Sequence, residues 1–233
     1  MLKKTILIIF LVLFAGNLNA EAKTYKMVFV PASEKGDESD YTSLIAIIEK
    51  LAGLNIDTIR VTDYNAAVEA MRAGRAHIAW YGGKTYVKAA EIASAEAFAA
   101  GVRPGEKDAG YYTYFVVKKH SKLKQLSDVK GKVLSLNTIG STSGDLIPQV
   151  ELSKINLSIK KKDHFKKAFY AGSHDACLLS VLNNQSDVCG MSSRNFEARL
   201  EDGTFKKDDV RIIHKSDRVP PPPLAYSKMI PKD

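Results

Sequence analysis

The 233-residue sequence is poor in cysteine, in clustered histidine and in long apolar runs. Its two cysteines, Cys177 and Cys189, are too few for a typical structural zinc site without histidines nearby. No group of His, Asp and Glu has the spacing of metal ligands. We therefore expect neither a metal site nor a cofactor.

The two cysteines leave two possibilities open. They lie on an expected helix and on the strand that follows it. An oxidising compartment permits a bridge between them. Spacing alone does not fix the geometry that a bridge needs. A Cys177–Cys189 disulfide and a pair of buried free thiols are thus both compatible with the sequence.

The one marked apolar run, Ile6 to Phe14, is short. Lys3 and Lys4 precede it and small or polar residues follow it up to Ala20, which is the layout of a secretory signal. A membrane-spanning helix needs about 20 apolar residues, and no stretch has them. We expect residues 1–20 to be a cleaved signal peptide and the mature protein to be soluble and exported.

The net charge is +8, but the lysines are scattered apart from two short runs, 160–162 and 166–167. Aromatic residues do not interleave with these runs, so solvated faces explain them better than a nucleic-acid surface does. We expect no nucleic-acid partner. A basic surface also attracts small anions.

Expected strands and helices alternate along the chain. We expect strands at 25–31, 56–61, 77–80, 111–118, 132–136, 166–170, 187–189 and 210–214, and helices at 40–51, 65–73, 85–93, 126–129 (one turn), from about 146, 175–183 and 196–201. This order predicts an α/β fold with largely parallel sheets. It repeats roughly twice, which predicts two lobes: 21–112 and 113–214, with 215–233 returning to the first.

Four prolines, 220–223, predict a rigid extended connector and exclude a helix or a central strand there. The chain ends ten residues later, at Asp233. Nothing after the connector is expected to close a lobe, so the C-terminal part is expected to be truncated.

The segment Gly140-Ser141-Thr142-Ser143-Gly144 lies between an expected strand and an expected helix. The first turn of a helix has unpaired N–H groups and the positive end of the helix dipole. Three hydroxyls add donors, and glycines allow a close approach, so the segment predicts an oxyanion cradle. The alternative is a plain helix cap.

Other readings of this segment fail. No lysine follows in a Walker arrangement. A nucleophile elbow needs Ser in the middle of the segment, where Thr142 stands. His174 and Asp175 are adjacent in sequence, a placement in which an acid rarely orients its neighbouring imidazole, so a catalytic triad is not expected. We expect a protein that is not an enzyme.

Four blocks of the sequence are similar to the periplasmic solute-binding proteins of phosphonate, phosphite and phosphate ABC importers. The blocks are Asp63-Tyr64-Asn65-Ala66 through 77–82, Gly110-Tyr111-Tyr112, Ser141-Thr142-Ser143-Gly144 with Pro148, and 171–176 with Asp187. They stand in the expected order over nearly the whole mature chain. The resemblance implies a two-lobed, type II-like clamshell that closes on its ligand in the periplasm. It also implies a monomer that delivers the ligand to an inner-membrane ABC permease.

The resemblance also implies roles for single residues. The cradle would hold the oxygens of the anion, Tyr64 and Tyr111 would offer hydroxyls from the cleft wall, and His174 would contact the anion from the second lobe. Asp175 would either accept a hydrogen bond from a protonated ligand oxygen or hold His174. The residues it implies as ligand-binding are Tyr64, Tyr81, Tyr111, Ser141, Thr142, Ser143, His174 and Asp175. For Tyr81, lobe packing is an equal alternative.

The sequence departs from the family where aminoalkylphosphonate binders carry carboxylates for the ligand's amine. One region reads Ser192-Ser193-Arg194 and the other is the proline run. An ammonium there would lack a counter-charge. We therefore expect an amine-free oxyanion: phosphite, phosphate or a simple alkylphosphonate. Alternatives are another oxyanion such as selenate, a sensor for the same anions in place of a transport receptor, and a secreted phosphate-handling enzyme.

Overall fold

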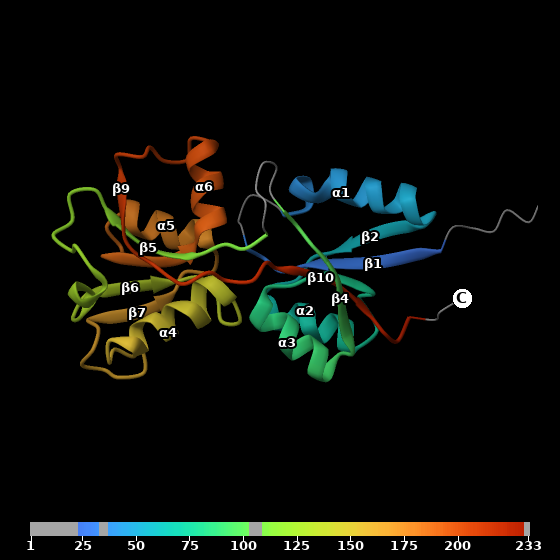
Figure 1. The fold of residues 1–233 in the computed structure, drawn as a ribbon, viewed down its shortest axis with the longest axis horizontal. Helices are drawn as coiled ribbons and strands as arrows, with labels where there is room; N and C mark the ends of the chain where they lie inside the picture. The colour runs from blue at the N-terminus through green and yellow to red at the C-terminus, as the bar shows by residue number, and fades with distance from the viewer. Residues whose placement is uncertain (1–22, 33–36, 103–108, 231–233) are drawn as a thin grey trace, which may run out of the picture.

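The computed structural model describes residues 23–32, 37–102 and 109–230. The expected signal peptide lies outside the described residues. These residues form two five-stranded sheets, each with helices on both faces, which lie next to each other along the long axis (Figure 1). None of the helices within the described ranges is both long and apolar enough to cross a bilayer.

The first lobe is built on the sheet with strand order β2-β1-β3-β10-β4. Its elements are β1 (Thr24–Phe29), α1 (Asp37–Ala52), β2 (Asn55–Ile59), α2 (Tyr64–Arg72), β3 (Ile78–Trp80), α3 (Gly83–Ile92), β4 (Ala95–Ala100) and β10 (Pro223–Ser227). Alternation along β1 sets the two cores: Met27 and Phe29 face α1, and Val28 packs with α2 and α3.

The second lobe is built on the sheet with strand order β7-β6-β8-β5-β9. Its elements are β5 (Thr113–Lys118), a 3₁₀ turn η1 (Leu126–Val129), β6 (Val133–Leu136), a π-helical turn η2 (Thr142–Leu146), α4 (Ile147–Lys154), β7 (Lys167–Tyr170), α5 (His174–Leu182), β8 (Val188–Ser192), α6 (Ser193–Glu201) and β9 (Val210–Lys215). A disulfide joins Cys177 of α5 to Cys189 of β8, with a Cα–Cα distance of 5.6 Å.

The two-lobed α/β fold is confirmed, but the expectation of largely parallel sheets is wrong. Strand β1 pairs in parallel with β2 and β3, and β6 pairs in parallel with β7 and β8. Strands β10 and β5 run antiparallel to both of their neighbours. Both antiparallel strands adjoin a crossing between the lobes, so they enter their sheets from the opposite direction.

We expected the proline run to exclude a central strand, and this expectation is wrong. Pro223 is the first residue of β10, where a missing N–H is tolerated, and β10 lies between β3 and β4. Residues 223–227, which follow the first three prolines, pack into the sheet of the first lobe. Strand β4 was also missed, because its alanine-rich sequence lacks the β-branched residues typical of strands.

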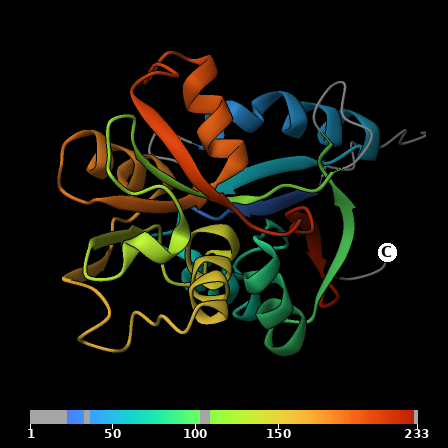
Figure 2. The ribbon, with the colours of Figure 1, turned by 60° about the vertical axis from the view of Figure 1, so that its left-hand side comes forward.

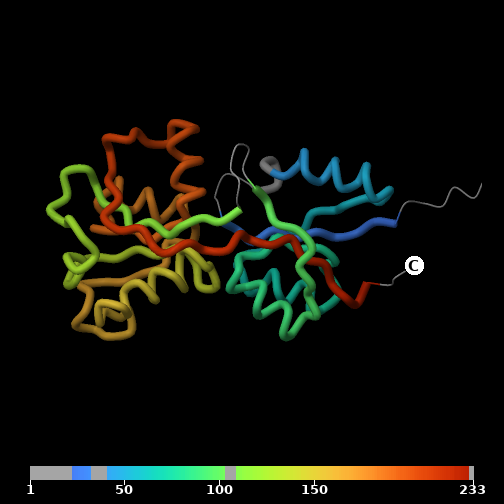
Figure 3. The backbone as a smooth tube through the Cα atoms, in the orientation of Figure 1, coloured from blue at the N-terminus to red at the C-terminus, as the bar shows by residue number. Residues whose placement is uncertain are grey.

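The chain passes between the lobes at two places, and the two crossings pair with each other. The Tyr111 N–H donates to the Val219 carbonyl (3.0 Å), and the Val219 N–H donates to the Tyr111 carbonyl (2.7 Å). The tube in Figure 3 shows the returning red segment running from the second lobe into the first. Two paired crossings form a natural hinge between the lobes.

Candidate ligand-binding site

A cavity of about 540 Å³ lies between the lobes. It sits beyond the carboxyl ends of the parallel strands β1, β3, β6 and β8, the usual place for ligands in α/β sheets. Figure 2 shows the ends of the two sheets facing one another. The lining residues are Phe29, Val30, Ala32, Tyr41, Tyr64, Trp80, Tyr81, Gly82, Gly101, Val102, Tyr111, Ser141, Thr142, Ser143, His174, Ser192, Arg194, Asn195, Ala198, Arg199 and Pro222.

The predicted cradle follows β6 and forms the π-helical turn η2 that leads into α4. The Ser141 hydroxyl caps this turn: it accepts from the Gly144 N–H (3.0 Å) and from the Asn137 side-chain amide (3.2 Å). The cap reading therefore holds for Ser141. In both bonds the Ser141 oxygen is the acceptor, so its hydroxyl proton can still be donated to another group.

Two glycines of the cradle are required by close contacts. Gly140 has φ of +100°, and a Cβ added there would lie 3.0 Å from Tyr64 Cβ. A Cβ added at Gly144 would lie 2.2 Å from Asn137 Cβ and 2.9 Å from His174 Cε1. Neither position can carry a side chain without movement of the site.

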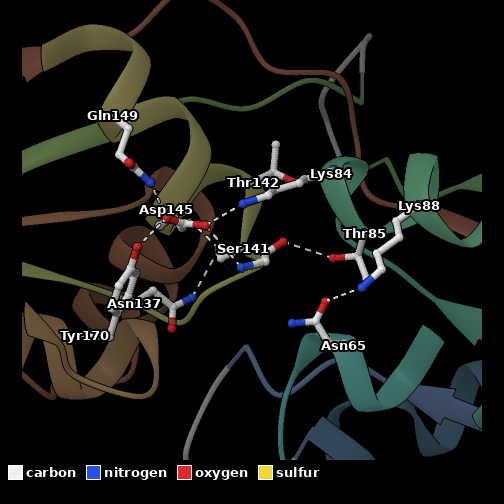
Figure 4. A network of polar contacts seen from close by, with 12 residues as sticks. Asn65, Lys84, Thr85, Lys88, Asn137, Ser141, Thr142, Asp145, Gln149 and Tyr170 are labelled. Atoms are coloured by element: carbon white, nitrogen blue, oxygen red, sulfur yellow. Dashed lines mark hydrogen bonds and ion pairs between the residues drawn. The ribbon is translucent and has the colours of Figure 1, made fainter. Parts of the chain in front are cut away.

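The cradle also contacts α3 of the first lobe through backbone and hydroxyl groups (Figure 4). The Lys84 N–H donates to Thr142 Oγ1 (2.9 Å), and the Thr85 hydroxyl donates to the Gly140 carbonyl (3.0 Å). Across the cavity, the His174 N–H donates to the Ala32 carbonyl (3.2 Å). The two lobes therefore contact each other both at the cradle and across the cavity, which closes the cleft at these two places.

An ion pair between the lobes supports this closure. Lys84 Nζ lies 2.6 Å from Asp145 Oδ2, and the Asp145 side chain is only 2% exposed. Tyr170 Oη (2.7 Å) and the Gly140 N–H (3.1 Å) also donate to this carboxylate. Burial raises the pKa of Asp145, but the bonds from Lys84, Tyr170 and Gly140 outweigh it and hold the pKa below its usual value.

Two predicted tyrosines line the cavity from different places. Tyr64 is the first residue of α2, whose N-cap Asp63 accepts from the Asn65 and Ala66 N–H groups. Tyr111 lies at the hinge bridge. Burial raises the pKa of the Tyr111 hydroxyl, whereas hydrogen bonds with Ser143 and Thr142 and the nearby Arg194 charge lower it. Tyr111 and the cradle residues Thr142 and Ser143 line the same cavity.

Two other predicted residues are directed elsewhere. Tyr81 lines the cavity with its ring, but its hydroxyl donates to the Ala67 carbonyl (3.3 Å) inside the first lobe. Asp175 is not among the lining residues, and its Oδ1 lies 3.2 Å from Arg199 Nε. Tyr81 therefore fits the packing alternative, and Asp175 fits a role in fixing α5 against α6.

His174 begins α5 and is almost fully buried in the cavity wall. The Ser192 N–H donates to its Nδ1 (3.2 Å), so the neutral ring carries its proton on Nε2. Burial lowers the pKa of His174 to about 4, against a smaller opposing effect of Asp175. Near neutral pH His174 is therefore a neutral hydrogen-bond donor and not a cation.

The His174 pKa predicts how stability depends on pH in the ligand-free protein. Because the unfolded histidine titrates near 6.5, the unfolded chain binds more protons between pH 6.5 and 4, and stability falls across this window as pH falls. The difference between the pKa of His174 in the unfolded chain and in the folded protein corresponds to about 3 kcal/mol of folding stability. We expect urea unfolding of the wild type to lose about that much more between pH 7 and 4 than His174→Gln does. Equal losses in both would contradict the assignment.

Three features in or beside the cavity have no signal in the sequence: the Lys84–Asp145 pair, the aromatic side chains Phe29, Tyr41 and Trp80, and the contact that the lining Arg194 makes between the lobes. Arg194 Nη2 donates to the carbonyls of Gly101 (3.3 Å) and Ala109. None belongs to a local motif, because each depends on two segments that are distant in sequence.

The two hinged α/β lobes, with hydroxyls, N–H groups and a histidine converging in the cavity between them, define the class of clamshell substrate-binding proteins. Over residues 27–233 the chain matches the family described as "ABC transporter, phosphonate, periplasmic substrate-binding protein". The chain belongs to this family of extracytoplasmic transport proteins.

Characterised relatives agree with this assignment. The chain is 29% identical over 202 residues to the phosphonates-binding periplasmic protein of Escherichia coli, which covers 84% of this chain and 58% of the relative. It is 26% identical to the phosphate-import protein PhnD of Mycolicibacterium smegmatis, over 84% of this chain and 64% of that protein. The chain thus spans less than two thirds of the length of these relatives.

Solved structures share the fold. A binding protein component of an ABC phosphonate transporter from Pseudomonas aeruginosa superposes with a TM-score of 0.81 at 24% identity, over 91% of this chain and 71% of that one. PhnD1 from Prochlorococcus marinus in complex with methylphosphonate gives 0.78 at 22% identity, over 89% and 77%.

Proposed function

We propose that this chain is the solute-binding component of an ABC importer and captures a small, amine-free phosphorus oxyanion, namely phosphite, phosphate or a simple alkylphosphonate. The observation that carries the proposal is the composition of the cavity. Hydroxyl, amide and imidazole donors gather around the cradle, and none of the described lining residues is Asp or Glu. Such a wall suits an anion and offers no described counter-charge to an amine.

The proposed ligand contacts follow from the hydrogen bonds already present. Ser141 and Thr142 both accept bonds from N–H groups, so each can direct its own hydroxyl proton to an anion. Ser143 and the two tyrosines, Tyr64 and Tyr111, would complete the hydroxyl set. His174 would donate from Nε2, since Nδ1 accepts from Ser192.

The proposal includes the surroundings of the site. We place the lobes at 21–112 and 113–214, with 215–233 as the return, because the paired crossings lie at Tyr111 and Val219. The proposal also takes a monomer as the binding unit. A periplasmic location after cleavage of the signal peptide, and an inner-membrane permease as partner, follow the family.

Calorimetric titration of the mature chain with a matched panel tests the proposal. The panel is phosphite, phosphate, methylphosphonate, 2-aminoethylphosphonate, sulfate and selenate. We expect at least one of the first three to bind at least tenfold more tightly than 2-aminoethylphosphonate, sulfate and selenate. Tighter binding of 2-aminoethylphosphonate would refute the amine-free ligand, and tighter binding of selenate would move the site to another class of oxyanion.

A further inference from the structure

A second part of the cavity lining differs in character from the cradle. Three aromatic side chains form this part: Phe29 at the end of β1, Trp80 at the end of β3, and Tyr41 on α1. The Phe29 and Tyr41 rings are stacked, with centroids 4.5 Å apart and planes 3° apart. The Tyr41 and Trp80 centroids are 4.8 Å apart. We call these three residues the aromatic wall.

The strand register holds the aromatic wall beside the cradle. Phe29 and Trp80 are register partners in the parallel pair of β1 and β3, so their rings emerge at the same carboxyl edge. Two residues after Trp80 stands Gly82, where an added Cβ would lie 3.1 Å from Thr142 Oγ1. One short segment therefore borders both the aromatic wall and the cradle.

Apolar residues accompany the aromatic wall in the cavity lining. Val102 and Pro222 line the cavity from the two crossings, and Gly101 lies against the indole, since an added Cβ would meet Trp80 Cη2 at 3.2 Å. Arg194 lines the cavity with its guanidinium 5.5 Å from the centre of the Tyr111 ring. This part of the lining offers ring faces and aliphatic surface, which favour an uncharged substituent.

The volume of the cavity fits an oxyanion with a substituent better than a bare oxyanion. At about 540 Å³, the cavity is in the range of sites that hold organic molecules, about 300–1,000 Å³. A tetrahedral oxyanion has five heavy atoms at most, so it occupies the cradle and leaves the aromatic wall without contact. Apolar surface contributes to the binding free energy only if the ligand removes it from water. A bare oxyanion leaves the aromatic wall in contact with water, whereas an apolar substituent would cover it.

We propose that the aromatic wall is a second subsite, which binds an uncharged planar substituent on the phosphorus atom, so that the ligands extend beyond the small oxyanions of the proposed function to arylphosphonates, which bind more tightly. This inference rests on the proposed function, because the phosphonate group would occupy the cradle. The substituent then leaves the cradle toward Trp80 and packs against the rings of the wall. Burial of an aromatic ring of this size with ring contacts corresponds to a gain of about tenfold to a hundredfold in affinity.

Calorimetry with phenylphosphonate and methylphosphonate on the mature chain tests the subsite. The variants are Trp80→Leu and Tyr41→Leu, which keep an apolar side chain but remove a ring. The matched control is Phe98→Leu, because Phe98 pairs with Tyr226 in the first lobe and does not line the cavity. We expect the wild type and Phe98→Leu to prefer phenylphosphonate at least tenfold. We expect at least one wall variant to lose most of that preference while its methylphosphonate affinity stays within about threefold.

The outcomes separate the subsite from the function on which it rests. If methylphosphonate binds and phenylphosphonate binds no more tightly, the subsite is refuted and the transport proposal stands. If the preference persists in both wall variants, or is lost equally in Phe98→Leu, the aromatic wall is not its cause. If neither compound, nor phosphite or phosphate, binds the wild type, the proposed function itself fails.

Discussion

Gly144→Ala is expected to lower the affinity for methylphosphonate at least a hundredfold and to destabilise the fold by about 2 kcal/mol. In an open helical turn the same change stabilises by up to about 1 kcal/mol, because glycine loses more backbone entropy on folding. Here the added Cβ meets Asn137 Cβ at 2.2 Å and His174 Cε1 at 2.9 Å. Neither neighbour is the far end of a flexible side chain, so overpacking decides the sign.

Calorimetry and urea unfolding of the same preparation measure both effects. Gly131→Ala is the matched control: Gly131 has φ of +72°, nothing lies within 4 Å of an added Cβ, and Gly131 is not among the residues that line the cavity. It should lose stability through backbone strain while keeping its affinity. If Gly144→Ala binds methylphosphonate as the wild type does, the cradle and His174 do not form the site.

Lys84→Met is expected to weaken ligand binding by about tenfold to thirtyfold with little change in the free energy of unfolding. The Lys84–Asp145 pair joins the lobes next to the cradle, and the carboxylate keeps the hydrogen bonds from Tyr170 and Gly140 after the change. Lys84 is 35% exposed, so the lost attraction is moderate. The loss falls on the closed form, because only that form makes the contact.

Lys88→Met provides the control for Lys84→Met. Lys88 lies one turn further along α3, and its Nζ contacts Asn65 Oδ1 (3.1 Å) within the first lobe (Figure 4). Lys88→Met therefore removes the same charge as Lys84→Met but does not remove a contact between the lobes. Calorimetry should separate the two variants, and small-angle scattering should show a larger radius of gyration for ligand-free Lys84→Met alone. Equal affinities in the two variants would mean that the ion pair does not contribute to closure.

The sequence predicted the parts of this protein that depend on local patterns. The order of strands and helices follows periodicity, so two α/β lobes could be expected. The cradle is a continuous segment between a strand and a helix, and it lines the cavity as expected. Its π-helical form was not foreseen, because a hydroxyl-rich glycine-flanked segment is equally compatible with an α-helical start.

What the sequence did not predict depends on packing between distant segments. The Tyr81 hydroxyl is directed into the first lobe because Ala67 presents a carbonyl there. Asp175 is held by Arg199 of the neighbouring helix. Strand β10 pairs with both β3 and β4, and these pairings stabilise a strand where the prolines alone predict none. Periodicity and propensity describe one segment at a time and carry no information on contacts between distant segments.

The most direct test of the cradle is one titration of methylphosphonate into the wild type and into the double variant Thr142→Val, Ser143→Ala. A hydrogen bond to a charged group contributes about 1.5–3 kcal/mol, so removal of two hydroxyls should weaken binding at least a hundredfold. The fold should survive, because both replacements keep the backbone and most of the side-chain volume. Undiminished binding by the double variant would contradict the assignment of this segment as the oxyanion site.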